Sequence, residues 1–217
     1  MKQNNLITIA TVITACLLAG CSDPADKVHK SDASAPKEET VAPAAASKTF
    51  VVRSESTIGF VGSKVTGSHS GGFKNFEGQV GVAGGKVVTP TEIKFAMAST
   101  WSDNEKLTGH LKSPDFFDAE KFPTTTFTVT AIEAATDGQK VTGNLALHGV
   151  TNSISFPAKI EVAETSLTVK AEFAINRKDF GINYPGKTDD LIRDNVVIKL
   201  DLSATPGEAR PQDQLAK

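Results

Sequence analysis

The side chains that could do chemistry are few, and they lie in separate segments of the 217-residue chain. The four histidines are His29, His69, His110 and His148, and no two have the HxH or HExxH spacing that is typical of zinc sites. We therefore predict no metal site. We interpret His110 as a hydrogen-bonding residue that pins a helical loop, and His148 as a turn residue beside Gly149.

Charged residues occur together at two places, with Asp115 and Asp118 at the first and Arg177 and Asp179 at the second. Paired carboxylates can act as general acid and base in a cleft that shifts their pKa values. Charged groups in loops are more often ion-paired or solvated, so we expect structural roles, for example an ion pair between Arg177 and Asp179 or Asp118. The sequence has no nucleophile elbow, phosphate-binding loop or dinucleotide fingerprint. We predict no catalytic residue and no cofactor.

The elements that position these residues follow from a hydrophobic period of two between residues 49 and 205. Apolar residues alternate with mostly polar ones in the runs 92–97, 141–147, 154–162, 167–175 and 196–202. Such alternation is typical of strands with one apolar face. Breakers at 84–85, 136–138 and 148–149 separate the runs and favour antiparallel hairpins.

One stretch, residues 104–118, breaks this alternation. Leu107, Leu111 and Phe116 are four and five residues apart there, which predicts a short helix that ends near Pro114. About eight amphipathic strands would leave two exposed edges in an open sheet, whereas closure removes the edges and creates an interior. We predict an all-β fold, an antiparallel, extended eight-stranded barrel with one short helical segment.

The interior can be filled or hollow. The aromatic residues of the chain are almost all purely apolar, since it has 12 Phe, one Trp and one Tyr. A filled core is the usual state of small barrels, and periodicity alone does not distinguish it from a lined tunnel. Small residues at inward positions, namely Gly62, Gly78, Gly143 and Ala171, are consistent with spare volume.

The N-terminal region has the pattern of an export signal. Residues 1–20 combine a short cationic start, the uncharged apolar run 6–18 and small residues, too short for a spanning helix. The string Leu18-Ala19-Gly20-Cys21 resembles a bacterial lipobox. This resemblance implies cleavage before Cys21, diacylglycerol on its sulfur and an acyl chain such as palmitate on its amino group. Ser22, by resemblance to such lipoproteins, implies the periplasmic face of the outer membrane.

Two flanking segments lack the composition of a core. Residues 21–48 contain no aromatic side chain and are rich in Ala, Pro, Ser and charged residues, which predicts a disordered tether after the lipidated cysteine. Residues 206–217 form a predicted C-terminal tail. The exported chain keeps one cysteine, so we expect no internal disulfide. A net charge of −2 offers no basic surface for nucleic acid.

Five motifs follow one another within the predicted barrel domain, residues 49–205. They are STIGF at 56–60, GFKNFEG at 72–78, HLKSPDFFD at 110–118 followed by Phe122-Pro123 and Phe127, GNLALHGVT at 143–151, and NRKDFG at 176–181. Together and in this order they resemble the YceI-like family of polyisoprenoid-binding proteins. The resemblance implies a lipocalin-like barrel, periplasmic or secreted, around a long lipid tail. Many members carry an Arg-Asp pair where this chain has Leu107-Thr108-Gly109, which leaves the ligand's head group open.

This resemblance favours a tunnel, with the inward apolar residues of the strands as its wall. The predicted ligand contacts are Phe60, Phe76, Phe95, Met97, Phe127, Val129, Leu145, Phe156, Phe173 and Ile175. The motif residues expected in loops at the barrel end are His110, Asp115, Phe116, Phe117, Asn176, Arg177, Asp179 and Phe180.

We predict a protein of the cell envelope that carries or sequesters a long apolar lipid, either a polyisoprenoid, an isoprenoid-quinone-like molecule or a fatty acyl chain, and that is held at the membrane through Cys21. Two alternatives stay open: an envelope adaptor with a filled barrel that binds a protein, and a less favoured lipid-modifying enzyme around His110, Asp115 and Arg177. An apolar void argues against the adaptor, and a carboxylate or histidine in that void favours the enzyme. The oligomeric state stays open, with a homodimer as one alternative.

Overall fold

The structure of the protein is a computed structural model, which describes residues 22–38 and 46–207. Its helices are η1 (Pro24–Lys27), η2 (Met97–Ser99), α1 (Glu105–Lys112) and η3 (Arg177–Phe180). Its strands are β1 (His29–Ser31), β2 (Lys48–Val52), β3 (Thr57–Lys64), β4 (Gly67–Phe73), β5 (Phe76–Ala83), β6 (Lys86–Ala96), β7 (Thr100–Ser102), β8 (Thr124–Ala135), β9 (Gly138–Leu147), β10 (Val150–Val162), β11 (Leu167–Asn176), β12 (Gly186–Lys187), β13 (Asp190–Leu191) and β14 (Asn195–Pro206).

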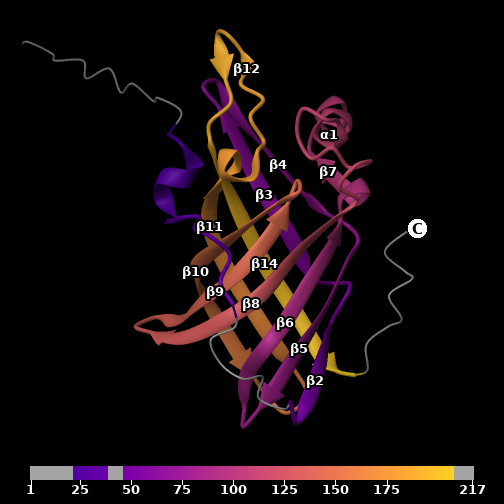
Figure 1. The fold of residues 1–217 in the computed structure, drawn as a ribbon, viewed down its shortest axis with the longest axis vertical. Helices are drawn as coiled ribbons and strands as arrows, with labels where there is room; N and C mark the ends of the chain where they lie inside the picture. The colour runs from indigo at the N-terminus through magenta and orange to yellow at the C-terminus, as the bar shows by residue number, and fades with distance from the viewer. Residues whose placement is uncertain (1–21, 39–45, 208–217) are drawn as a thin grey trace, which may run out of the picture.

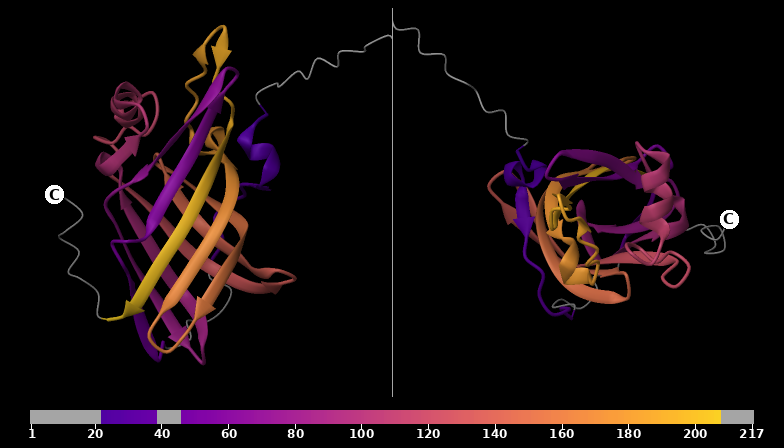
Figure 2. Two further views of the ribbon diagram at one scale, coloured as in Figure 1. Left: turned by 180° about the vertical axis from the view of Figure 1, so that it is seen from behind. Right: turned by 90° about the horizontal axis from the view of Figure 1, so that it is seen from above.

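The main sheet closes on itself because β11 pairs with β14 as well as with β10. Three pairs of consecutive strands each act as one interrupted strand: β2 with β3 beside β14, β4 with β5, and β6 with β7. Counted in this way, eight antiparallel strands form a complete ring, which is seen end-on in Figure 2. The predicted eight-stranded antiparallel barrel with a single helix is confirmed.

Tight turns join the strands where the breakers were found. His148 and Gly149 have φ values of 53° and 76° and connect the paired residues Leu147 and Val150. Two central residues with positive φ form the turn whose twist suits an antiparallel hairpin. The interpretation of His148 as a turn residue is therefore confirmed.

The predicted helix is α1, which lies beside β7 at the upper end of the barrel (Figure 1). It begins after Asn104, whose side-chain oxygen accepts a hydrogen bond from the Leu107 backbone N–H at 3.0 Å. It ends at Lys112, two residues before Pro114, and buries Leu111 against the barrel. The helix expected within residues 104–118 is confirmed.

The predicted disordered tether, residues 21–48, is wrong for the described residues 22–38 and 46–48. Strands β10 and β11 pair directly only over 159–162 and 167–170, and β1 pairs with β11 where they part. Ser34 and Ser153 then exchange two backbone hydrogen bonds of 3.0 and 2.9 Å. Composition concealed this packing because it works through backbone groups, which any residue carries, and through small side chains such as those of Asp23, Ala25 and Ser31. Residues 39–45 lie outside the described residues.

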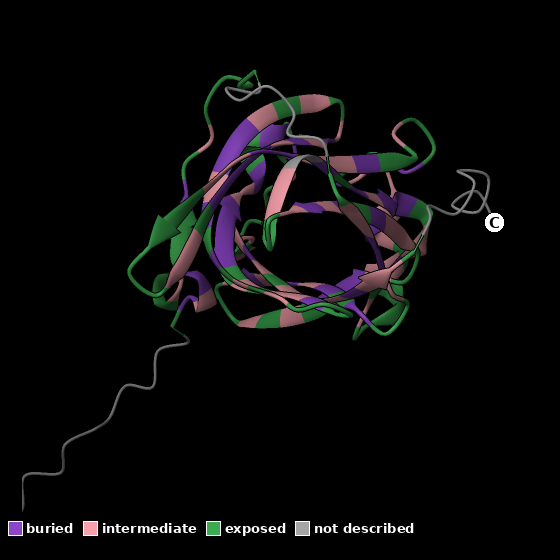
Figure 3. Cartoon of the chain, turned by 90° about the horizontal axis from the view of Figure 1, so that it is seen from below, coloured by how far each residue is buried: buried purple, intermediate pink, exposed green. Residues whose placement is uncertain are grey.

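Buried and more exposed residues alternate along the strands (Figure 3), as expected where every second residue of a barrel strand faces the interior. The end of the barrel away from α1, which we call the blind end, is a filled core around Phe50, Leu167 and Ala204, which are 0%, 1% and 1% exposed. Among the described residues, no helix is long and apolar enough to cross a membrane. The predicted signal peptide, Cys21 and residues 208–217 of the predicted tail lie outside the described part.

Candidate functional site

An apolar cavity occupies the barrel between the blind end and α1. Its volume is about 180 Å³, whereas a single water molecule needs about 10–15 Å³. Its wall presents only apolar atoms, and it is partly open to solvent. The half-buried residues Gly62, Phe117 and Ile192 line it at the α1 end, which we call the mouth.

Seven of the ten predicted ligand contacts line this cavity. The strand period explains why, because inward residues of neighbouring strands meet on one face. Phe156 and Phe173 lie with parallel rings, their centroids 4.0 Å apart, and Phe127 packs 5.6 Å from Phe156. The seven are Phe60, Phe95, Phe127, Leu145, Phe156, Phe173 and Ile175.

The other three, Phe76, Met97 and Val129, are not brought to the cavity wall. Met97 belongs to η2, because β6 ends at Ala96 and the strand period stops there. Its side chain is 1% exposed, and its backbone N–H donates to the Pro123 carbonyl at 2.9 Å. Val129 precedes a register shift between β8 and β9, and Phe76 is half-buried at the start of β5. All three pack in the core or against it.

Sequence reasoning missed many of the lining residues, and two groups among them differ in the signal that the sequence offered. The first comes from β14, where Val196, Ile198, Leu200 and Leu202 face the cavity. The alternation of residues 196–202 was the available signal for this face. The second group, Ile182 and Ile192, comes from the irregular segment 181–194, where no period could reveal an inward face.

The inward glycines do not all leave spare volume. A Cβ at Gly143 would lie 2.4 Å from the Phe127 ring, and one at Gly78 would lie 2.2 Å from Ile93. These positions are filled by cross-strand neighbours, so their interpretation as spare volume is wrong, and Ala171 packs against the core without lining the cavity. Gly62 is different, since it lines the cavity and nothing lies within 4 Å of an added Cβ.

Arg177 fixes the segment 181–194 across the cavity's upper end. The residue is 4% exposed, and its guanidinium donates to the carbonyls of Arg193, Ile182 and Ile192 at 3.1, 2.6 and 3.3 Å. Burial lowers the pKa of Arg177. The Asp194 carboxylate, 3.5 Å from the guanidinium, acts in the opposite direction and raises this pKa. The predicted ion pair with Asp179 or Asp118 is wrong, because the guanidinium points inward to carbonyl groups.

The remaining motif residues build the loops that border the mouth. His110 Nε2 lies 2.8 Å from the Asp115 carboxylate, and its ring contacts Phe116 and Tyr184 at centroid distances of 4.9 and 5.0 Å. The interpretation of His110 as a pin for the helical loop is confirmed. Phe116 and Phe117 also line the cavity.

The second motif shapes η3 in the same manner. The Asn176 side chain accepts a hydrogen bond from the Lys178 N–H at 3.0 Å and so begins this short helix. The Asp179 carbonyl accepts from Asn152 at 2.8 Å. Phe180 is fully buried, and its carbonyl lies 3.2 Å from His148 Nδ1. These residues support the loops and do not line the cavity wall.

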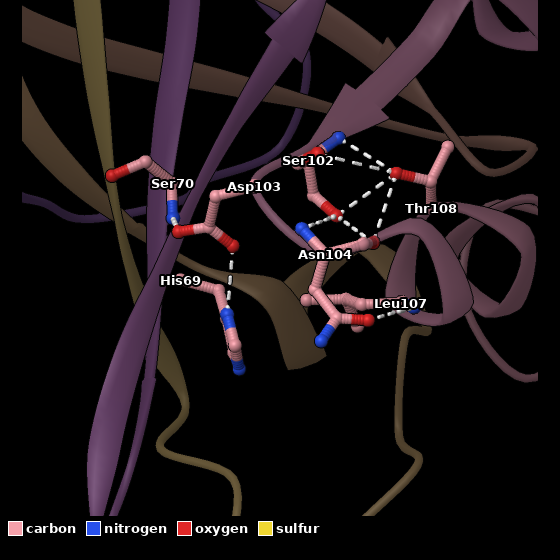
Figure 4. Close-up of polar contacts among 7 residues, drawn as sticks. All are labelled: His69, Ser70, Ser102, Asp103, Asn104, Leu107 and Thr108. Carbon is pink, nitrogen blue, oxygen red and sulfur yellow. Dashed lines mark hydrogen bonds and ion pairs between the residues drawn. The ribbon is translucent and has the colours of Figure 1, made fainter.

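A polar cluster ties β4 to the chain that enters α1 (Figure 4). The Asp103 carboxylate lies 2.7 Å from His69 Nδ1 and accepts a hydrogen bond from the Ser70 N–H at 2.8 Å. The Ser70 N–H is the main cause that lowers the pKa of Asp103, and His69 adds to it. Thr108 then accepts from the Ser102 N–H at 2.8 Å. This cluster holds α1 in place at the mouth.

The cavity offers little acid–base chemistry. Of the described residues that line it, Thr125 and Arg177 are the polar ones, and neither is a carboxylate or a histidine. No group of three His, Cys, Asp or Glu side chains within the described ranges could hold a metal ion. The arrangement is suited to enclosing an apolar chain.

Solved structures share this fold. BcnA of Burkholderia cenocepacia matches with a TM-score of 0.63 at 24% identity, over 70% of this chain and 97% of that one. A polyisoprenoid-binding domain from Saccharophagus degradans, implicated in plant cell wall breakdown, matches with a TM-score of 0.60 at 18% identity, over 74% of this chain and 99% of that domain. At these identities the likeness concerns the fold.

The chain also has sequence relatives in Pseudomonas. A UPF0312 protein of Pseudomonas putida strain W619 is 33% identical over 132 residues, which is 56% of this chain and 68% of the relative. A UPF0312 protein of Pseudomonas syringae pv. tomato is 30% identical over 159 residues, covering 66% and 81%. The YceI-like domain matches residues 50–204, one residue inside each end of the predicted domain. The chain therefore belongs to the YceI-like family.

Proposed function

We propose that this protein binds a long apolar lipid inside its barrel and carries or sequesters it at the bacterial envelope. The observation that supports this proposal best is the cavity, whose wall is apolar, which is partly open to solvent, and which lies between the packed blind end and the half-buried mouth residues Gly62, Phe117 and Ile192. A polyisoprenoid, an isoprenoid-quinone-like molecule or a fatty acyl chain has the shape and polarity to occupy it. The Saccharophagus domain of the same fold is a polyisoprenoid-binding domain.

The energetics favour a tail over a compact ligand. Each methylene moved from water to the cavity contributes about 0.8 kcal/mol, so a long tail needs no charged contact to bind. Arg177 uses its guanidinium on carbonyl groups of the segment 181–194. We infer that the tail enters first and that a polar head group stays at the mouth.

Membrane attachment through Cys21 is the second part of the proposal. The string Leu18-Ala19-Gly20-Cys21 supports it, together with Ser22 for the periplasmic face of the outer membrane. Several acyl chains on one residue anchor a protein stably, whereas one gives only marginal binding. Cys21→Ser should therefore release the protein from membranes, and a serine variant that stays bound after a high-salt wash contradicts the anchor.

Two other functions have less support. A protein adaptor with a filled barrel conflicts with the space inside this one. A lipid-modifying enzyme needs an acid or base beside its substrate, and His110 and Asp115 pair with each other outside the cavity wall.

The experiment that tests binding is a chain-length series. Fatty alcohols of increasing length are titrated against the delipidated protein loaded with a fluorescent polyprenyl probe. We expect the Kd to fall severalfold with each added methylene, following about 0.8 kcal/mol per group, until the cavity is full, and then to level off. A probe that does not bind, or a Kd independent of length, contradicts the proposal.

A further inference from the structure

The large apolar side chains that are exposed in the described residues all lie at one end of the barrel. Val65 and Leu191 are 54% and 50% exposed, and Trp101 on β7 is 39% exposed. Val65 is at the tip of the β3–β4 hairpin and Leu191 is in β13, and both hairpins project beyond the barrel at its α1 end (Figure 1). The blind end carries no such side chain among the described residues.

The two hairpin tips are held together as one surface. The Val65 N–H donates to the Leu191 carbonyl at 3.2 Å. Asp190 pairs with Lys64 and accepts hydrogen bonds from the Thr66 N–H and hydroxyl at 3.1 and 2.9 Å. Charge near the tips is thus partly neutralised, and the aliphatic side chains are left outward.

These tips adjoin the cavity mouth. Ile192 follows Leu191 directly and lines the cavity. Lys64, the last residue of β3, forms an isolated antiparallel β-bridge with Ile192. A lipid tail that leaves a surface in contact with the tips would therefore meet the cavity wall close to Val65 and Leu191.

The N-terminal segment is also fixed at this end. Asp23 is 9% exposed and accepts hydrogen bonds from the Ala25 N–H at 3.0 Å and the Ser63 hydroxyl at 3.3 Å, and it lies 3.8 Å from Arg193. Ser63 is next to Gly62, which lines the cavity. Cys21, the predicted lipidation site, is only two residues before Asp23 in the sequence.

We propose that the hairpin tips around Val65 and Leu191 dock into the surface of a lipid bilayer, with the mouth toward it. The inference rests on the proposed function, namely lipid on Cys21 and a lipid in the cavity. A 27-residue flexible tether would leave the barrel free to turn, whereas an anchor two residues from Asp23 holds the mouth end at the bilayer. A tail can then pass between bilayer and cavity with little exposure to water.

The test uses the full lipidated chain, purified from bacterial membranes and reconstituted into phosphatidylcholine vesicles with brominated acyl chains. The single tryptophan is moved by combining Trp101→Phe with Val65→Trp. We expect bromine to quench this tryptophan. The matched control is Ala163→Trp in the same background, an exposed position in the β10–β11 turn at the blind end, which should not be quenched.

A second variant tests transfer. Val65→Glu combined with Leu191→Glu should slow the movement of a fluorescent polyprenol from vesicles into the protein by about tenfold or more, because carboxylates are costly to place among lipid tails. Its Kd for the same polyprenol in detergent solution should stay unchanged, since neither side chain lines the cavity.

The outcomes are distinguishable. Equal quenching at positions 65 and 163, or none at position 65 in a protein whose Cys21 carries lipid by mass spectrometry, overturns the docking proposal while leaving the lipid-binding function intact. Cross-linking of the tips to another protein without quenching overturns it as well. A Cys21 without lipid overturns both the anchor and this orientation, and loss of polyprenol binding in detergent overturns the proposed function itself.

Discussion

Gly62→Phe should close the cavity from its mouth without disturbing the barrel. The residue lines the cavity on β3, and an added Cβ meets no atom within 4 Å. A phenyl group at this position therefore points into space that a lipid tail would occupy. Phenylalanine also suits a strand better than glycine does, so we expect the free energy of unfolding to stay within about 1 kcal/mol of the wild type.

The loss of affinity follows from the length of tail that the ring displaces. We take three methylenes as the smallest displacement, which is about 2.4 kcal/mol at about 0.8 kcal/mol each and corresponds to a roughly 50-fold higher Kd. Long tails should lose more than short ones, because a short tail can lie wholly beyond the ring in the space lined by Phe156 and Phe173.

The assay is displacement of a fluorescent polyprenyl probe by long and short alcohols, with a denaturant melt of each variant. Gly67→Phe is the control, since Gly67 also has nothing within 4 Å of an added Cβ but lies outside the cavity lining. If Gly62→Phe binds long alcohols as tightly as Gly67→Phe does, with both proteins folded, the tail does not lie where we place it.

Four further predictions concern stability and are checked by denaturant melts. Phe50→Ala, in the filled blind end, should cost about 3–5 kcal/mol, and Phe173→Ala should cost less because its ring faces a void; equal costs would show a filled barrel. Deleting residues 22–38 should lower the midpoint, because β1 would no longer pair with β11; overlaid melts would show a true tether. Arg177→Met should destabilise the protein by about 1–3 kcal/mol, since three carbonyls lose their donor, and an unchanged midpoint would contradict the role of Arg177. The lowered pKa of Asp103 means that its contribution is full above about pH 4 and lost as the pH falls below that, so wild type and Asp103→Asn should converge in acid and differ at neutral pH.

The hydrophobic period of two predicted most of the fold, because the alternation involves neighbouring residues and can be read from a single sequence. It indicated the strands, and closure followed from the cost of open edges. It failed at Met97, where the chain turns into η2 one residue after β6 ends. It also gave no indication of β1, whose pairing with β11 uses backbone groups that carry no sequence signal.

The candidate site was predicted in part for the same reason. Inward residues such as Phe156 and Phe173 follow from the period, but whether an inward glycine leaves a void depends on the rotamers of its neighbours. The Phe127 ring covers Gly143, whereas nothing covers Gly62. The inward direction of Arg177 depended on the path of the segment 181–194, which has no repeating pattern.

The central claim is that a lipid tail lies inside this barrel, and native mass spectrometry of the protein purified from its own envelope tests it most directly. Wild type and Gly62→Phe are prepared in parallel. We predict one lipid per wild-type chain, retained in gentle conditions, and markedly lower occupancy in the variant. A wild-type protein that carries no lipid, or a variant that carries the same lipid to the same extent, would contradict the account.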